Sequence, residues 1–330
     1  MPLAAWKRIA IRTWNQSWID NAGLVAAGVA FYGFMALIPL LAILVLIYGF
    51  FAGPETVLAN MQALTAILPA DIAVLIGEQL MTAVGTSEGT KGFAILAALG
   101  VALYGGTNAA SAIIMALNIA YHEREKRGLL RFYMLAIGMT VGGLLLALLA
   151  LGATAAVTSL DEILPQASGA TVLLGKAASY VVLMFGAAAI AATLYRYGPS
   201  RERARWNWIT PGSMFTAVGW LLLTIGFGFY VTRVTDYGAT YGSLGAMVAL
   251  LTWMYLSAYV FVFGAELNSE IEHQTAKDST TGDPEPIGKR GAWAADHVAG
   301  EDDDGNSAKE IAEQPSMAEA TPTTSTDDKD

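Results

Sequence analysis

The sequence contains no cysteine and has little charge for its length. Without cysteine the chain has no disulfide, no thiol nucleophile and no thiolate metal site. Only 14% of its 330 residues are charged, whereas soluble domains carry roughly 25%. Hydrophobic residues make up 55%, the mean hydropathy is +0.48, and the apolar residues form long blocks rather than alternating segments. The predicted fold class is therefore all-α, and the chain is expected to be a helical integral membrane protein.

Six apolar stretches are long enough to cross a bilayer, since a spanning helix needs about 20 residues. They cover residues 24–52, 92–120, 130–158, 171–194, 211–234 and 244–265. The sequence therefore predicts a polytopic protein with a six-helix transmembrane bundle over residues 23–271. No cleavable signal peptide is evident before the first stretch, so we expect that stretch to remain as an anchor.

Residues 1–22 mix tryptophans with basic residues, a pattern typical of an amphipathic helix lying at the membrane interface. A plain helical extension of the first span is the alternative. The loop over residues 53–91 contains two further apolar segments at helical spacing, which are too short and too polar to span. We expect these segments to be amphipathic interfacial helices as well.

The basic residues of the loops are distributed unevenly between the two sides of the predicted bundle. One side carries 11 Lys and Arg residues, in groups around residues 7–12, 124–131 and 196–205. The other side carries only three, Lys91, Lys176 and Arg233. Since cytoplasmic loops of membrane proteins carry the excess of Lys and Arg, both termini are expected to be cytoplasmic.

The net charge of −9 belongs to the C-terminal tail. Up to residue 271 the chain has 14 Lys and Arg against 13 Asp and Glu, and beyond that residue it has 5 against 15. The tail has few large apolar residues and buries too little surface to offset the entropy of ordering. We expect residues 272–330 to form a disordered acidic cytoplasmic tail, and binding of a basic partner by this tail is an alternative function.

The three histidines do not form a recognisable metal or catalytic motif. His122 follows the second stretch, His273 follows the last, and His297 lies in the tail. None stands at a metal-ligand spacing from another histidine or a carboxylate cluster. Because RNA cleavage needs metal ligands or a positioned acid and base, nuclease activity is not expected. The sequence predicts no catalytic, cofactor-binding or metal residues, no cofactor and no nucleic-acid partner.

Polar residues recur along one face of the second stretch, at steps of three and four residues. The candidates on this face are Asn108, Ser111 and Asn118. They are expected either to hold the bundle together through interhelical hydrogen bonds or to line a substrate path. In the first stretch, Pro39 removes one backbone hydrogen bond, which produces either a static kink or a hinge.

Two further candidates lie at the ends of spans. Arg196 follows the fourth stretch, and with the other basic loop residues it forms a cationic surface that would attract anionic headgroups, or that only determines topology. The last stretch carries one polar face, which consists of Thr252, Tyr255, Tyr259 and Glu266. Glu266 lies near a helix C-terminus, where a carboxylate is unfavourable unless a cation is near. We expect an arginine partner for it, with simple exposure or proton and substrate handling as alternatives.

Three parts of the chain resemble one family. They are "AAGVAFYGFMALIPLLAIL" (26–44), "YGGTNAASAIIMALNIAYHEREKRGLLR" (104–131), and residues 206–272 with "TYGSLGAMVALL" and "FGAELNSEIE". Together they are similar to the YihY/BrkB family of bacterial inner-membrane proteins, whose members have six predicted spans. The family has carried ribonuclease and virulence-factor labels, and roles in envelope or lipid export have been proposed for it. Gly33 and Ala36 stand where relatives more often have Thr and Ser, which weakens any polar site on that turn.

Three functions remain open from the sequence. The first is transport or export of a lipid-like or amphipathic anionic substrate across the cell inner membrane. The second is a membrane scaffold or envelope regulator that does not transport, and the third is an intramembrane enzyme. The expected partners are membrane lipids, with anionic headgroups at the cytoplasmic arginines. No protein partner is identified, and small residues on several spans are compatible with a homo-oligomer.

Overall fold

The computed structural model describes residues 3–51, 88–143, 145, 169–233 and 244–299. In this part of the chain the regular elements are all helices. One isolated β-bridge pairs Ala204 with Thr280. The labelled helices are α1 (Leu3–Ile19), α2 (Ala22–Phe51), α5 (Glu88–Ala120), α7 (Gly169–Tyr197), α8 (Trp206–Arg233), α10 (Gly245–His273) and α11 (Trp293–Asp296). A shorter apolar helix covers Leu129–Gly143. The predicted all-α class is therefore confirmed.

Three described helices are long and apolar enough to cross a membrane, namely Leu99–Ala120, Trp206–Val231 and Gly245–His273. A fourth span results if α1 and the first part of α2 are counted as one broken helix. The chain is thus consistent with a multi-pass membrane protein, but the count of six is not established. The predicted interfacial helices between residues 53 and 87, and half of the predicted third span, lie outside the described residues.

The chain bends by 65° between α1 and α2, at Asp20 and Asn21. Asn21 has a φ of 52°, in the left-handed region that asparagine tolerates better than most residues. Helix α1 is therefore not a straight extension of the first span. The buried side chains of α1, which include Ile9, Thr13 and Ser17, recur every fourth residue and form the face that packs on α10.

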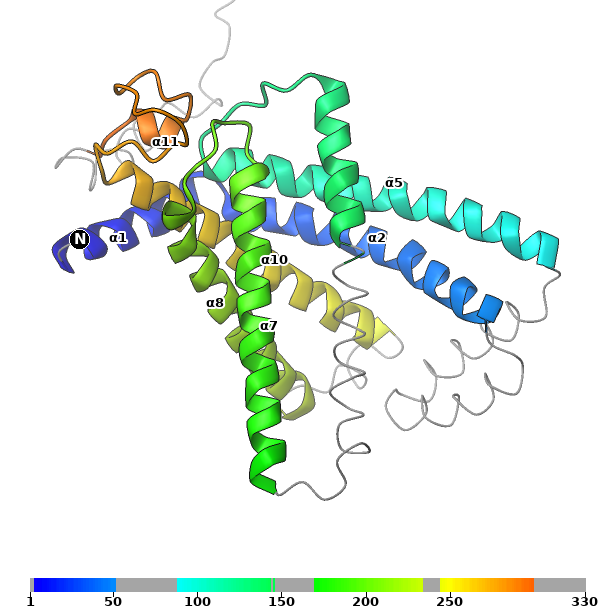
Figure 1. Ribbon diagram of the computed structural model, residues 1–330. Coiled ribbons are helices and arrows are strands. Elements are labelled where there is room, and N and C mark those ends of the chain that lie inside the picture. Colours follow the sequence, from blue (N-terminus) through cyan, green and yellow to red (C-terminus); the bar gives the residue numbers. More distant parts are fainter. Residues whose placement is uncertain (1–2, 52–87, 144, 146–168, 234–243, 300–330) are drawn as a thin grey trace, which may run out of the picture.

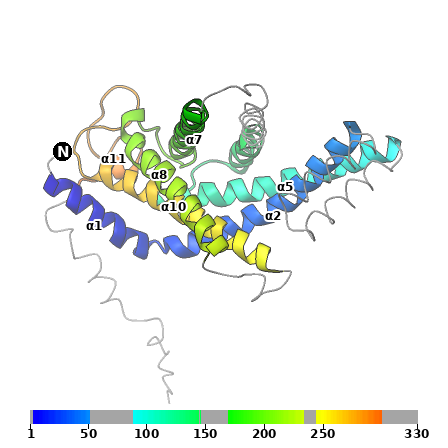
Figure 2. The ribbon, with the colours of Figure 1, turned by 90° about the horizontal axis from the view of Figure 1, so that it is seen from below.

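Helix α10 is the centre of the described bundle. It contacts α1, α2, α5 and α8, while α7 packs against α8. Helices α2 and α5 run antiparallel side by side and extend away from the others (Figures 1 and 2). The buried core lies where the C-terminal ends of α5, α7 and α10 meet the start of α8, and it includes Leu117, Tyr121, Tyr195, Ile209 and Ala265. The same end of the molecule contains most of the buried polar groups.

Helices α8 and α10 approach so closely that only glycine fits at the crossing. A Cβ atom on Gly212 would meet the backbone oxygen of Gly264, and a Cβ atom on Gly264 would meet the hydroxyl of Thr216. Asn268 bridges the two helices, since its Oδ1 accepts from the Gly212 amide at 2.7 Å and its Nδ2 donates to the Ile209 carbonyl at 3.0 Å. This crossing fixes the end of α10 relative to the start of α8.

Residues 274–299 fold back over this end of the bundle, which differs from the disorder expected beyond residue 272. This segment is held together by hydrogen bonds of buried polar side chains rather than by a large apolar core. The guanidinium of Arg290 donates to the carbonyls of Ala276, Glu285 and Ala295, and Asp278 accepts from Thr280 and Glu285. Composition does not reveal such a network, and residues 300–330 lie outside the described part of the chain.

Candidate functional site

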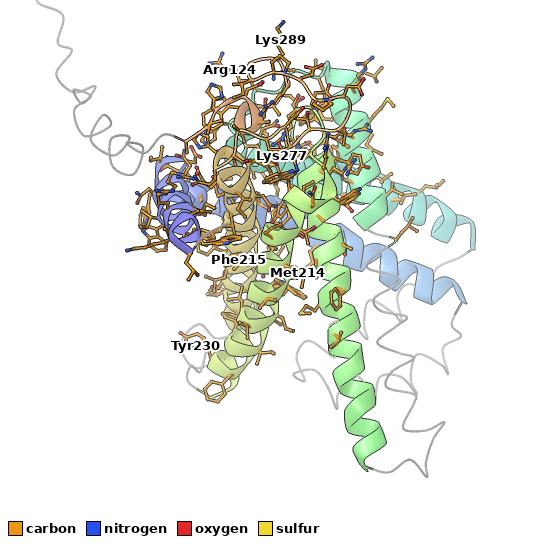
Figure 3. The ribbon with its side chains drawn as sticks, turned by 60° about the vertical axis from the view of Figure 1, so that its left-hand side comes forward. Arg124, Met214, Phe215, Tyr230, Lys277 and Lys289 are labelled. Carbon is orange, nitrogen blue, oxygen red and sulfur yellow. The ribbon has the colours of Figure 1, made fainter. Side chains whose placement is uncertain are left out.

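The candidate site is the polar end of the bundle, where the α1–α2 junction, the end of α5, the loop before α8 and the end of α10 converge (Figure 1). Figure 3 shows Arg124, Lys277 and Lys289 at this end, and Met214, Phe215 and Tyr230 along the apolar length of α8. The buried charged residues of this end are Arg12, Glu123, Glu266, Glu270, Glu272, Asp278 and Arg290. So many buried charges at one end need partners, and most of them have one.

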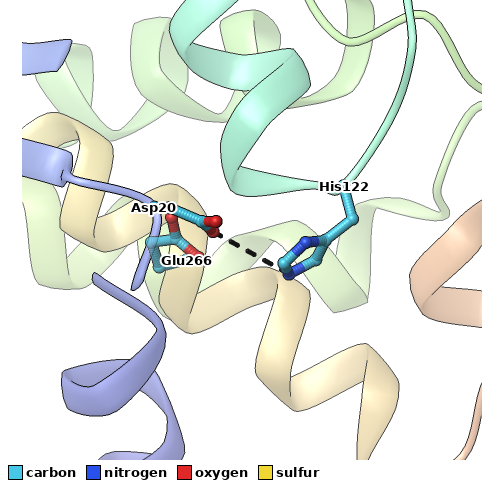
Figure 4. A group of neighbouring side chains, drawn as sticks. All are labelled: Asp20, His122 and Glu266. Atoms are coloured by element: carbon cyan, nitrogen blue, oxygen red, sulfur yellow. Dashed lines mark ion pairs between the residues drawn. The ribbon is translucent and has the colours of Figure 1, made fainter. Parts of the chain in front are cut away.

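Glu266 lies at the centre of a group with Asp20 and His122 (Figure 4). Its side chain is fully buried, and neither of its oxygens has a hydrogen-bond partner among the described residues. The Nε2 atom of His122 lies 4.0 Å from Oδ2 of Asp20. Burial lowers the pKa of His122, although the Asp20 carboxylate acts in the opposite direction. Among the described residues, Glu266 therefore has no arginine partner. It is not exposed to solvent either, so neither of these two expectations holds.

Arg12 of α1 pairs instead with a carboxylate on the next turn of α10. Nε of Arg12 lies 2.7 Å from Oε2 of Glu270, and both side chains are almost fully buried. Arg12 also donates to Gln274 at 2.9 Å, and His273 lies 3.6 Å from the same Glu270 oxygen. This pair fixes α1 against the end of α10, and it satisfies the positive charge of Arg12 with Glu270 rather than Glu266.

A second buried ion pair joins the loop before α8 to α10. Nη2 of Arg201 lies 2.6 Å from Oε2 of Glu272, and Ser279 donates to that oxygen at 2.9 Å. The guanidinium carbon also lies 5.1 Å from the centre of the Tyr121 ring. Burial acts to lower the pKa of Arg201, but the neighbouring carboxylate outweighs it and holds that pKa above its usual range.

A cleft of about 560 Å³ opens beside this pair, between the loops that follow α5 and α7. The cations that line it are Lys126, Arg127, Arg196, Arg201 and Arg203. Arg127 pairs with Glu125 at 2.7 Å. Although burial opposes the effect, hydrogen bonds from Arg127 and Asn118 lower the pKa of Glu125 to about 2. The cleft is thus strongly cationic, with part of its charge already paired.

Arg196 is the least satisfied cation of the cleft. Its Nε and Nη1 atoms are buried and have no hydrogen-bond partner among the described residues. Its guanidinium lies 4.4 Å from the ring centre of Trp206 and 5.6 Å from that of Tyr197. The guanidinium of Arg203 lies 5.1 Å from the centre of the same Tyr197 ring. Arg196 and Arg203 form no ion pair with another described residue, so their charges are available to an anion.

The polar face of α5 divides into separate environments. Asn118 is buried and fastens two loops, because it donates to Glu125 at 2.9 Å and accepts from the Ser200 amide at 2.7 Å. Asn108 and Ser111 are half-buried, and the Ser111 hydroxyl has no hydrogen-bond partner among the described residues. The structure therefore assigns Asn118 a bracing contact, while the role of Asn108 and Ser111 stays a prediction.

The candidates on α10 also have different surroundings. Tyr259 reaches α1, with its hydroxyl 3.3 Å from Ser17 Oγ, and its ring lies 6.5 Å from that of Tyr255. Thr252 donates to the Val248 carbonyl of its own helix at 2.8 Å. Pro39 lies within α2, and its side chain is outside the described residues. Of the four candidates on α10, only Glu266 belongs to the group with Asp20 and His122.

The residues around Trp293 form a further polar and aromatic cluster that the sequence does not reveal. All three histidines of the chain pack around its ring, with centre-to-centre distances of 4.3 Å for His122, 5.1 Å for His273 and 4.6 Å for His297. The Trp293 amide donates to Glu123 at 2.7 Å, which fastens the C-terminal segment to the end of α5. Residues 122, 273 and 297 share no spacing that could have revealed this, since the contact depends on the fold-back of residues 274–299.

Comparison with known proteins gives a consistent result. A family model described as Virulence factor BrkB matches residues 13–287. The "Putative ribonuclease-like protein YfkH" of Bacillus subtilis (strain 168) is 27% identical over 186 residues, which cover 55% of this chain and 65% of that protein. A UPF0761 membrane protein of Pseudoalteromonas translucida (strain TAC 125) is 28% identical over 276 residues, covering 79% and 85%. One of Vibrio atlanticus (strain LGP32) is 27% identical over 271 residues, covering 77% and 79%. No solved structure matches the chain significantly.

Proposed function

The chain belongs to the virulence factor BrkB family of membrane proteins, and we propose that it transports or exports a lipid-like or amphipathic anionic substrate across the bacterial inner membrane. In this proposal the bundle has six spans and both termini lie in the cytoplasm. The polar end then faces the cytoplasm, in agreement with the excess of Lys and Arg at that end. The substrate's anionic headgroup would enter from this side.

The observation that carries the proposal is the cationic cleft with its unpaired Arg196. Guanidinium groups bind phosphate and carboxylate through fixed, often bidentate hydrogen bonds, and two buried nitrogens of Arg196 have no hydrogen-bond partner in the described part of the chain. A cleft of about 560 Å³ is large enough for a phospholipid headgroup. These features support binding of an anion at this position.

The setting of the cleft favours an amphipathic substrate over a small soluble anion. Trp206, which stacks on Arg196, is the first residue of α8, one of the helices long enough to span the membrane. The large side chains along α8 are exposed, with Leu222 at 64% and Phe215 at 42%. An anionic headgroup at Arg196 would therefore have its acyl chains beside the apolar flank of α8.

A membrane scaffold without transport activity is the second candidate. The fold-back of residues 274–299 supports it, because this segment presents an ordered polar surface over the end of the bundle. Enzymatic activity is not part of the proposal. The ribonuclease-like name belongs to the relative from Bacillus subtilis, and nuclease chemistry has no place in the function proposed here.

Transport can be tested in proteoliposomes that contain a fluorescent anionic phospholipid, with a membrane-impermeant quencher reporting movement between leaflets. The double variant Arg196→Gln/Arg203→Gln removes the two unpaired charges of the cleft. Because a hydrogen bond to a charged group contributes about 1.5–3 kcal/mol, the rate is expected to fall at least about tenfold.

The matched control is Arg124→Gln/Lys289→Gln, which removes two exposed cations of the same end that do not line the cleft. The control is expected to transport at the wild-type rate. No lipid movement in wild-type proteoliposomes, or equal rates for both double variants, would favour the scaffold instead.

A further inference from the structure

Three side chains from distant parts of the sequence meet inside the polar end of the bundle. Asp20 comes from the α1–α2 junction, His122 from the turn after α5, and Glu266 from the last turns of α10 (Figure 4). One ligand atom of each lies within 4.8 Å of the others. The group is separate from the cationic cleft, since none of the three lines it.

Glu266 has no partner that would stabilise its charge. The side chain is fully buried, and both oxygens lack a hydrogen bond within the described part of the chain. Arg12 of α1 is bonded to Glu270 at 2.7 Å, and His273 lies 3.6 Å from the same carboxylate. Asp20 and Glu266 therefore lie close together, and His122 is the basic side chain that the described residues place in this group. A buried carboxylate without a partner is costly, so a group of this kind needs a cation or a proton.

We propose that Asp20, His122 and Glu266 bind a divalent first-row transition-metal ion, of which Zn²⁺ and Mn²⁺ are the test cases. Two carboxylates balance the charge of such an ion and suit Mn²⁺, and an imidazole ligand favours Zn²⁺ over Mg²⁺ and Ca²⁺. Three protein ligands also leave a coordination position for water or another group.

The observed spacing is close to what coordination requires. Ligand bonds of about 2.0–2.2 Å in a tetrahedral site place neighbouring donor atoms about 3.3–3.6 Å apart. Nε2 of His122 and Oδ2 of Asp20 are 4.0 Å apart, so these two atoms need to approach by less than about 1 Å. Rotation of the Asp20 and Glu266 side chains can supply this movement without a change of the helices.

Neighbouring residues hold two of the ligands in place. Gln16 donates to Oδ2 of Asp20 at 3.0 Å, and the Trp293 ring lies 4.3 Å from the ring of His122. His122 itself has a φ of 54°, a backbone conformation uncommon for a residue other than glycine. Outer contacts of this kind orient the ligands of metal sites. The bound ion would join the α1–α2 junction to the ends of α5 and α10.

The direct test uses the full-length protein, stripped with a chelator and titrated with one metal at a time. Isothermal titration and elemental analysis are expected to give one Zn²⁺ or Mn²⁺ per chain, with Mg²⁺ and Ca²⁺ binding at least about tenfold more weakly. Pulsed electron paramagnetic resonance of the Mn²⁺ form should detect one imidazole nitrogen. Wild-type protein that binds neither metal, or Mn²⁺ bound without a nitrogen ligand, would overturn the proposal.

Single substitutions then assign the ligands. Asp20→Asn, His122→Asn and Glu266→Gln are each expected to weaken Zn²⁺ affinity at least about tenfold. His297→Asn and Glu285→Gln, which change an exposed histidine and an exposed carboxylate of the same end, are expected to bind as the wild type does. Equal affinity in all five variants would show that the metal binds elsewhere. If a ligand variant does not fold, the imidazole signal of the wild type still decides the question.

Discussion

Replacement of Arg201 by methionine is expected to destabilise the protein by about 3–5 kcal/mol, because it removes one partner of a buried ion pair. The side chains of Arg201 and Glu272 are 2% and 0% exposed, so water does not replace the lost contact. Methionine fills a similar volume and leaves the Tyr121 ring covered. The cost therefore comes from the Glu272 carboxylate, which among the described residues keeps only its hydrogen bond from Ser279.

Equilibrium unfolding in mixed micelles, followed by helical circular dichroism, measures this cost. The double variant Arg201→Met/Glu272→Gln removes both charges and is expected to recover more than half of the loss, which gives a coupling energy above about 1 kcal/mol. Lys126→Met is the matched control. It removes a cation that is paired with Glu123 but 62% exposed, and its expected cost is below about 1 kcal/mol.

Two results would refute this reasoning. The first is an Arg201→Met variant that is no less stable than the Lys126→Met control. The second is a double variant that loses the sum of the two single losses, since additive losses would mean that the side chains do not stabilise one another.

Three further predictions concern the same end of the molecule. Gly264→Ala is expected to cost at least about 1–3 kcal/mol, because the added carbon meets the α8 backbone and side chains, and the unfolding assay above measures it. Tyr195→Phe leaves the Phe261 carbonyl without its 2.7 Å hydrogen bond and is expected to cost about 1–3 kcal/mol, whereas no change would contradict the contact. Arg127 lowers the pKa of Glu125 from its usual 4.5 to about 2, so the stabilisation by Glu125 is complete above pH 4.5 and is lost as pH falls toward 2. Glu125→Gln should therefore flatten stability between these pH values, and an unchanged acid profile would contradict it.

The sequence was sufficient to predict the helical class and the apolar lengths, because both follow from composition and local runs of residues. It also predicted that Glu266 continues a polar face of α10 with Tyr259. It did not predict that Asp20 and His122 are the neighbours of Glu266. Glu266 and Glu270 are four residues apart, so they lie on one face of α10 a single turn from each other, whereas Glu272 points to another side of the helix. Which of them meets Arg12 depends on the bend before α2.

The site was also hidden because its members are far apart in the sequence. Asp20 and His122 come together only through the packing of α2 against α5, and Glu266 reaches them through α10. The ordered part of the C-terminal segment was missed for another reason. Its order depends on buried hydrogen bonds of Arg290, which average composition does not record.

The most direct test of the proposed function is the affinity of the purified protein for an anionic lipid, measured by native mass spectrometry with phosphatidylglycerol and phosphatidylcholine. The wild type is expected to bind phosphatidylglycerol more tightly than phosphatidylcholine, and Arg196→Gln/Arg203→Gln should lose this preference with an affinity at least about tenfold lower. The Arg124→Gln/Lys289→Gln control should keep it. An equal preference in all three proteins would contradict a headgroup site in the cationic cleft.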